Sequence, residues 1–236
     1  NNDKYLLSRF IKGKFYVSGN ILNNVFPIKK FANNQNLNEI TFISSKKYIS
    51  SEDYSKHIDF NLFSNLIDYC QKKNINLSYV SKSGLEKKSK INKIFNCKSF
   101  NYIPFRNKSE SMSDFNSYEK LSNSKLMIFS ESTMGHEFIS KGTKVISFNP
   151  NFPNEIFCKK YKKYGIYWSK KIEFKKFDKM INKVFYMKQK EWDKKTKKVS
   201  SEILKYDYNN ENNILVFKKI FNTSLNKLFK IRSIKK

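Results

Sequence analysis

Short apolar runs alternate along the chain with longer stretches in which apolar residues recur every three or four positions. The short runs are rich in β-branched and aromatic residues, a composition typical of buried strands. The longer stretches predict amphipathic helices, one with Asp59 as its N-cap and one with Asp114 as its N-cap. The predicted strands are Lys14–Ser18, Glu39–Ser44, Leu77–Ser81, Ser99–Ile103, Leu126–Ser130, Lys144–Phe148 and a weaker Ile166–Trp168.

This order predicts an α/β fold, a Rossmann-like parallel sheet with helices on both faces. Sheets of this kind bind ligands at the carboxyl ends of their strands, so we expect the chemistry in the loops that follow the strands. Two helical faces are predicted to point inward, one made of Phe60, Phe63, Ile67 and Cys70, the other of Phe174, Phe177, Ile181 and Val184.

The amino-acid composition and the net charge limit the classes of protein to which this chain can belong. The 236 residues include 39% hydrophobic residues, which is enough for a core and excludes a disordered basic chain. The formal charge of +27 suggests a nucleic acid or an anionic lipid as partner. Only three of the basic residues are arginine, the side chain that is best suited to recognise nucleic-acid bases. The preferred interpretation of the charge is therefore a generally basic surface, and no specific nucleic acid is expected. The basic C-terminal run from Lys227 to Lys236 could lie on an anionic membrane surface or form a docked final helix.

Several sites and signals are absent from the sequence. No apolar run approaches the roughly 20 residues of a membrane-spanning helix, and no secretory signal is visible. Cys70, Cys97 and Cys158 are far apart, so no disulfide framework and no metal site are expected, and Cys70 is interpreted as a buried small hydrophobe. A reducing, cytoplasmic setting fits best. Because the chain begins with Asn1, we expect it to be a fragment.

The turn after Leu126–Ser130 carries the strongest candidate chemistry. Ser130, Ser132 and Thr133 offer hydroxyls, and backbone amides at a helix N-terminus form an anion site. Gly135 would let the backbone approach a phosphate, and Glu137, one turn later, could accept hydrogen bonds from ribose hydroxyls. The alternative is that Ser132 or Thr133 only caps a helix that ends at Gly142. His136 is interpreted as a surface residue rather than a base.

The segment Ser132-Thr-Met-Gly-His-Glu137 with Gly142-Thr-Lys-Val-Ile146 resembles the nucleotide-sugar-binding half of GT-B glycosyltransferases. More narrowly, it is similar to bacterial surface-carbohydrate biosynthesis proteins of that superfamily. Their hallmark is Ser-Thr-Leu-Gly-Tyr-Glu followed by a Gly-Lys-Lys-Val strand, and His136 departs from it. Further pieces resemble the family in the same order: Val17–Asn24, Phe42–Ser45, Tyr164–Trp168, Glu191-Trp192, and Tyr206-Asp207 with Asn209 and Asn210.

The resemblance implies a transferase whose substrates are a nucleotide-sugar donor and a carbohydrate acceptor, without a metal or a separate cofactor. Residues 14–222 would be the donor-binding domain, residues 1–13 a remnant of an N-terminal domain or a linker helix, and residues 223–236 a basic tail. The protein would work in the cytoplasm, either free or at the inner face of the membrane.

By the family pattern, Glu137 would contact the ribose, and Arg106 and Lys82 would contact the base or a phosphate. The residues at the donor phosphates would be Ser130, Ser132, Thr133, Gly135, Gly19 and Asn20. Lys82 stands where the family has an arginine-containing turn. No catalytic base is assigned, because most of the N-terminal domain is missing.

Two other functions compete with this one. A sugar-nucleotide epimerase of GT-B-like architecture would need carboxylates and a histidine in its cleft, and His57 and His136 are the only histidines in the chain. A non-enzymatic nucleic-acid-binding module would rest on charge alone, because the sequence contains no recognised nucleic-acid-binding motif.

Overall fold

The computed structural model describes residues 37–45, 57–81, 88–97, 99–104, 121, 124–149, 165–169, 173–203 and 214–222. The chain divides into two compact units, one of residues 28–203 and one of residues 1–27 with 204–236. The first unit contains the sheet. In the second, residues 214–222 form a helix. The domain boundaries drawn from the sequence, at residues 13/14 and 222/223, stay predictions.

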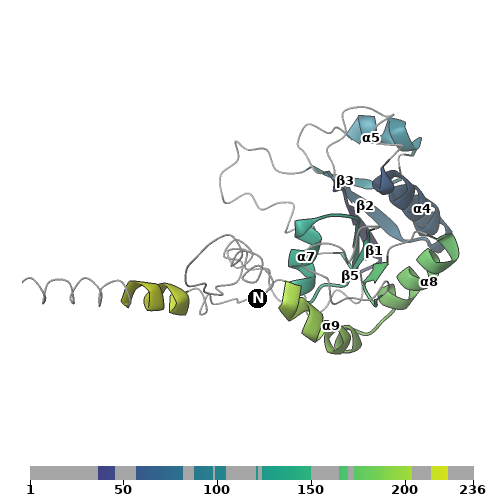
Figure 1. Ribbon diagram of the computed structural model, residues 1–236. Coiled ribbons are helices and arrows are strands. Elements are labelled where there is room, and N and C mark those ends of the chain that lie inside the picture. Colours follow the sequence, from purple (N-terminus) through teal and green to yellow (C-terminus); the bar gives the residue numbers. More distant parts are fainter. Residues whose placement is uncertain are drawn as a thin grey trace, which may run out of the picture. The chain divides into compact units, whose positions relative to one another are not determined.

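The first unit contains a six-stranded parallel sheet in the order β3-β2-β1-β4-β5-β6 (Figure 1). Helices cover both faces, so the predicted α/β, Rossmann-like parallel sheet is confirmed. Tyr69 of α4 donates a hydrogen bond to Asn182 of α8 at 2.8 Å, so these two helices lie on one face, while α7 contacts α9 on the other. The strands are β1 (Glu39–Ile43), β2 (Asn76–Val80), β3 (Asn101–Ile103), β4 (Leu126–Phe129), β5 (Val145–Phe148) and β6 (Trp168–Ser169).

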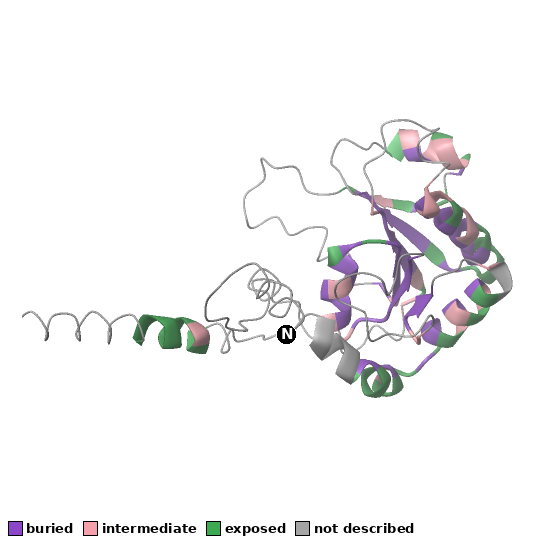
Figure 2. Ribbon diagram, viewed as in Figure 1, coloured by how far each residue is buried: buried purple, intermediate pink, exposed green. Residues whose placement is uncertain are grey.

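The strands form where the apolar runs predict them, with ends shifted by one or two residues. All four residues of β4 and of β5 are buried, as are four of the five in β1 and in β2 (Figure 2). Continuous burial is expected for parallel strands that helices cover from both sides, which is why these segments do not alternate with polar residues. The predicted strand at Lys14–Ser18 lies outside the described residues.

The helices bury the faces that their spacing predicts. In α8, Phe177, Ile181 and Val184 are fully buried, and in α4 Phe63, Ile67 and Cys70 are buried, which confirms Cys70 as a core residue. The described helices of this unit are α4 (Ile58–Lys73), α5 (Lys88–Phe95), α7 (Thr133–Ser140), α8 (Phe174–Phe185) and α9 (Gln189–Ile203). The helix predicted after Asp114 lies almost wholly outside the described residues.

One predicted helix cap is wrong. Helix α4 is capped by His57, whose Nδ1 accepts a hydrogen bond from the Asp59 amide at 3.2 Å, and Asp59 itself lies in the first turn. Phe60, which was predicted to face inward, is only half-buried, while Leu62, Leu66 and Tyr69 join the buried face. The helix dipole favours an aspartate in the first turn of a helix as well as at the N-cap. The sequence pattern alone therefore does not distinguish the two positions.

A buried lysine joins the sheet to helix α8. Lys144 is 3% exposed, and its Nζ donates hydrogen bonds to the carbonyl oxygens of Phe185, at 3.4 Å, and of Met187. Phe185 is the last residue of α8 and Met187 follows its C-cap Tyr186, so the cation lies at the helix C-terminus, where the helix dipole favours it. Burial lowers the pKa of Lys144 to about 8, with a further lowering by Lys125.

The pKa of Lys144 predicts a dependence of stability on pH. In the unfolded chain the amine keeps an ordinary pKa of about 10.4, so between about pH 8 and 10 the unfolded state binds more protons than the folded state. The free energy of unfolding should therefore rise with pH across this window. In Lys144→Met the rise should be smaller, as measured by urea unfolding at several pH values. Lys72→Met, an exposed lysine of α4, should keep the wild-type slope. Equal slopes for Lys144→Met and wild type would contradict the assignment.

Candidate functional site

The sheet order places a topological switch point between β1 and β4. From β1 the chain adds β2 and then β3 on one side, and it then returns to place β4, β5 and β6 on the other side. Strands β1 and β4 are in register, with Ile43 beside Phe129 at their carboxyl ends. In open α/β sheets, ligands bind outside the carboxyl ends of the strands at such a point. The segments that follow β1 and β4 are therefore the first place to look for a site.

Buried polar residues stand at the carboxyl ends of five strands. Their exposed fractions are 5% or less. The strand ladder still includes this edge, because the amides of Ser44, Ser81 and Asn149 donate to neighbouring strand carbonyls at 3.0–3.1 Å. The residues are Ser44, Ser81, Ser130, Asn149 and Ser169.

The carboxylate of Asp59 connects the two strands of the switch point. Its Oδ2 accepts hydrogen bonds from the amide of Ser45 at 2.8 Å and from the hydroxyl of Ser45 at 2.9 Å. Its Oδ1 accepts from the hydroxyl of Ser130. Ser45 follows β1, Ser130 follows β4, and Asp59 is fully buried in the first turn of α4. One carboxylate thus holds two strand ends and a helix start together.

These bonds also decide what Ser130 can offer a ligand. A hydroxyl has a single proton, and that of Ser130 is donated to Asp59. As long as this bond is kept, Ser130 has only lone pairs for another group, whereas a phosphate needs donors. Ser130 therefore supports the turn, and its predicted contact with a phosphate stays a prediction.

The N-terminus of α7 lies two residues beyond Ser130. Ser132 is the N-cap, with φ −150° and ψ 122°, and its side chain makes no capping hydrogen bond. Ser132 thus stands at the N-cap and the helix ends just before Gly142, whose φ is +88°, as the alternative predicts, but the side chain of Ser132 makes no capping hydrogen bond. The hydroxyl of Ser132 and the first amides of α7 are left to bind another acceptor, which is the arrangement that binds an anion. Thr133 is exposed at the first helical position.

Gly135 lies against the ring of Phe129. A Cβ built on Gly135 would be 2.3 Å from the nearest ring carbon of Phe129, a separation that real Cβ atoms do not show. The absence of a side chain therefore lets the first turn of α7 pack onto the last residue of β4. This packing explains the glycine without a ligand, and its predicted approach to a phosphate stays a prediction.

Glu137 is buried in α7, while Ser140 and the C-cap residue Lys141 are half-buried. Glu137 is 8% exposed. Burial lowers the pKa of Lys141 to about 8, and the attraction of Glu137 opposes part of this lowering, so Glu137 and Lys141 interact along the helix.

His136 was expected to be a surface residue, but it is only partly exposed. Its Nδ1 is buried and has no hydrogen-bond partner, its ring meets that of Phe129 edge-on at 5.2 Å, and burial lowers its pKa to about 4. His136 is thus neutral at pH 7, so it cannot supply a positive charge to a phosphate there.

The structure brings together the predicted residues of the β4–α7 turn, which are Ser130, Ser132, Thr133, Gly135 and Glu137. Gly19, Asn20, Lys82 and Arg106 lie outside the described residues. The part that sequence reasoning missed is the Ser45–Asp59 connection. A usable signal was present, because Ser44 and Ser45 directly follow a buried strand, just as Ser130 does.

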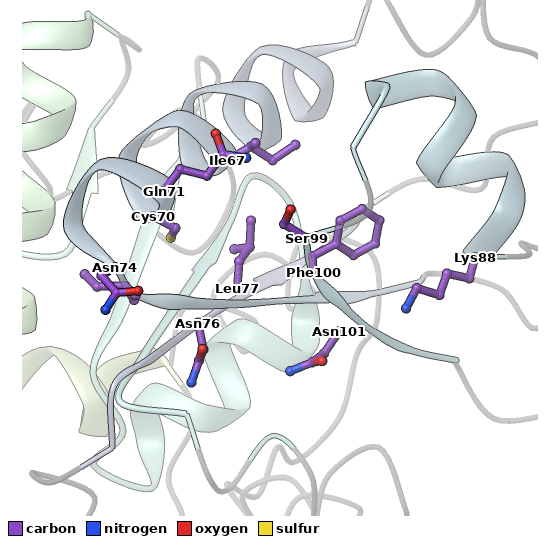
Figure 3. Close-up of a pocket in the computed structure, with 11 residues that line it drawn as sticks. Ile67, Cys70, Gln71, Asn74, Asn76, Leu77, Lys88, Ser99, Phe100 and Asn101 are labelled. Atoms are coloured by element: carbon purple, nitrogen blue, oxygen red, sulfur yellow. The ribbon is translucent and has the colours of Figure 1, made fainter.

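A separate pocket of about 430 Å³ lies at the other end of the strands (Figure 3). It is lined by the last turn of α4, including Cys70 and Gln71, and by the starts of β2 and β3. Figure 3 shows Asn76 and Asn101 directed to the opposite side of the strands from Leu77, so the polar groups do not converge on one point. The pocket is not part of the switch-point site.

Among the described residues, no three His, Cys, Asp or Glu side chains gather in a way that could hold a metal ion. None of the helices in this part of the chain is both long and apolar enough to cross a bilayer.

The family comparison covers nearly the whole chain. A family model with the description "putative O-antigen biosynthesis protein" matches residues 2–221. No curated protein matches the chain.

The connection made by Asp59 can be tested with an isosteric change. Asp59→Asn keeps the shape but removes the charge and one acceptor, so the free energy of unfolding should fall by about 1.5–3 kcal/mol, as expected for hydrogen bonds to a charged group. Asp68→Asn is the matched control, because Asp68 is exposed on the same helix and loses the same charge. Urea unfolding at pH 7 measures both variants. If both lose equally little, Asp59 does not hold the switch point.

The close packing of Gly135 and Phe129 predicts a coupled pair. Gly135→Ala should lower the free energy of unfolding by about 1–3 kcal/mol, because the added methyl group overpacks the contact. The same change made in a Phe129→Leu background should cost less, since the smaller side chain leaves room. Thr133→Ala, at an exposed position of the same turn, should have little effect. Additive losses in the double variant, measured by urea unfolding, would show that the two residues do not meet.

Proposed function

Because the chain belongs to a family described by its link to O-antigen biosynthesis, we propose that it is the donor-binding part of a GT-B-type glycosyltransferase that builds a surface polysaccharide. The observation that carries the proposal is the uncapped N-terminus of α7 at the switch point. The resemblance of Ser132–Glu137 to the nucleotide-sugar-binding half of these enzymes supports the same position.

The diphosphate of a nucleotide sugar fits the chemistry of this turn. The hydroxyl of Ser132, the exposed Thr133 and the first amides of α7 are donors, and the positive end of the helix dipole favours an anion. In transfer from a nucleotide sugar, negative charge develops on the leaving phosphate, so preorganised donors at this place would stabilise the transition state.

Two carboxylates have separate roles in this proposal. Asp59 acts on the protein, because its oxygens accept from Ser45 and Ser130 and thereby keep the turn in place. Glu137 acts on the donor, as an acceptor for the ribose hydroxyls. The carbohydrate acceptor and the catalytic base would come from parts of the protein outside the described residues.

The proposal predicts binding of a nucleotide sugar to the full chain. Calorimetric titration with UDP-, GDP- and CMP-sugars should give a saturable signal with one of the three bases. Ser132→Ala should weaken that binding by roughly tenfold to a hundredfold, the effect of losing one hydrogen bond to a charged group. It should cost little stability, because the hydroxyl makes no capping bond.

Glu137→Gln should weaken the same binding by about tenfold or more, since a neutral amide is a poorer acceptor for the ribose. Glu131→Gln is the matched control, because Glu131 is exposed and precedes the same helix. Thermal unfolding of each variant shows whether it is folded. If no nucleotide sugar binds, or if folded Ser132→Ala and Glu137→Gln bind as wild type does, the proposed donor site is wrong.

A further inference from the structure

The helix of residues 214–222 carries most of the exposed large hydrophobic side chains of the described residues. Five of the six belong to this helix, and Figure 2 shows it mainly as exposed. Phe217 is 60% exposed and Phe221 is 64% exposed. Such side chains are rarely left in water together, so the helix has the character of an interaction surface.

The helical spacing places the aromatic residues on one face. Ile214, Phe217 and Phe221 are three and four positions apart, so their side chains are neighbours, and Lys218 lies beside them. A helix with aromatic and aliphatic residues next to lysines is typical of segments that lie in the interface of a membrane.

The charge of residues 214–236 indicates which kind of partner this helix would bind. From residue 214 to 236 the chain has seven Lys or Arg residues and no Asp or Glu. Two copies of this segment would repel one another, so a second copy of the chain is a poor partner. A nucleic acid would attract the lysines but would leave most of the apolar face in water. An anionic bilayer satisfies both features, because its headgroups attract the cations and its acyl boundary accepts the rings.

We propose that the helix of residues 214–222 docks the protein on the surface of an anionic phospholipid bilayer. Phe217 and Phe221 insert at the boundary between headgroups and acyl chains, and Lys218, beside them on the helix, faces the headgroup phosphates. This proposal does not depend on the donor site, since it involves none of the residues of the β4–α7 turn.

Flotation of the full chain with vesicles tests the proposal. The protein should float with vesicles of phosphatidylcholine and phosphatidylglycerol, and hardly with phosphatidylcholine alone. In about 1 M salt, where the Debye length is about 3 Å, the bound fraction should fall strongly. Lys218→Gln should weaken binding by about fivefold, the effect of one cation near an anionic surface. Phe217→Ser with Phe221→Ser should weaken it by roughly tenfold or more for each ring.

Tyr186→Ser is the matched control for the loss of an exposed aromatic ring, because Tyr186 is 61% exposed and lies outside the helix. This variant should float as wild type does, and circular dichroism should show all variants folded. The proposal is overturned if the wild type does not bind anionic vesicles, or if the double phenylalanine variant binds as well as the wild type does. It is equally overturned if light scattering shows a wild-type dimer that this variant dissociates, or if double-stranded DNA binds more tightly than the vesicles.

Discussion

The switch point of this protein depends on one buried carboxylate. Strands β1 and β4 end side by side at the switch point, with Ile43 paired to Phe129, and a serine follows each strand. Asp59 accepts from Ser45 and from Ser130, and so gives the two strand ends a common partner inside the protein. A buried charge is tolerable only when donors surround it, and here a backbone amide and three hydroxyls donate to Asp59, that of Ser44 at 3.5 Å. The position of the β4–α7 turn follows from this arrangement.

The two ends of the sheet differ in kind. At the carboxyl ends, buried serines and Asn149 form a polar edge beneath the turn that follows β4. At the amino end of β5, the ammonium group of Lys144 donates hydrogen bonds to the carbonyl oxygens of Phe185 and Met187, at and just beyond the end of α8. The polar edge at the carboxyl ends is therefore the candidate place for a ligand, whereas the Lys144 contact at the amino end stabilises the fold. A pocket does exist near the amino ends of β2 and β3, but its polar groups diverge.

The strands and the buried helix faces could be predicted because their signals are local. The apolar runs at Leu126–Phe129 and Val145–Phe148 need no knowledge of the rest of the chain to be recognised as buried strands. The β4–α7 turn could be found for the same reason, since its serines and glycine are contiguous. The role of Asp59 could not, because its partners are 14 and 71 positions away in the sequence. The partial burial of His136 could not be predicted for the same reason, because it depends on the strand residue Phe129, whose ring its own ring meets edge-on.

The missing side-chain cap of α7 has a consequence for motion. Amides that no protein group accepts exchange their hydrogens with water more readily than those inside a helix. The first turn of α7 should thus be the least protected part of that helix in the free protein, although the turn lies against the well-packed ring of Phe129. A bound acceptor at this end would slow the exchange of those few amides. Hydrogen exchange would in that way identify an occupied site even where the bound group is unknown.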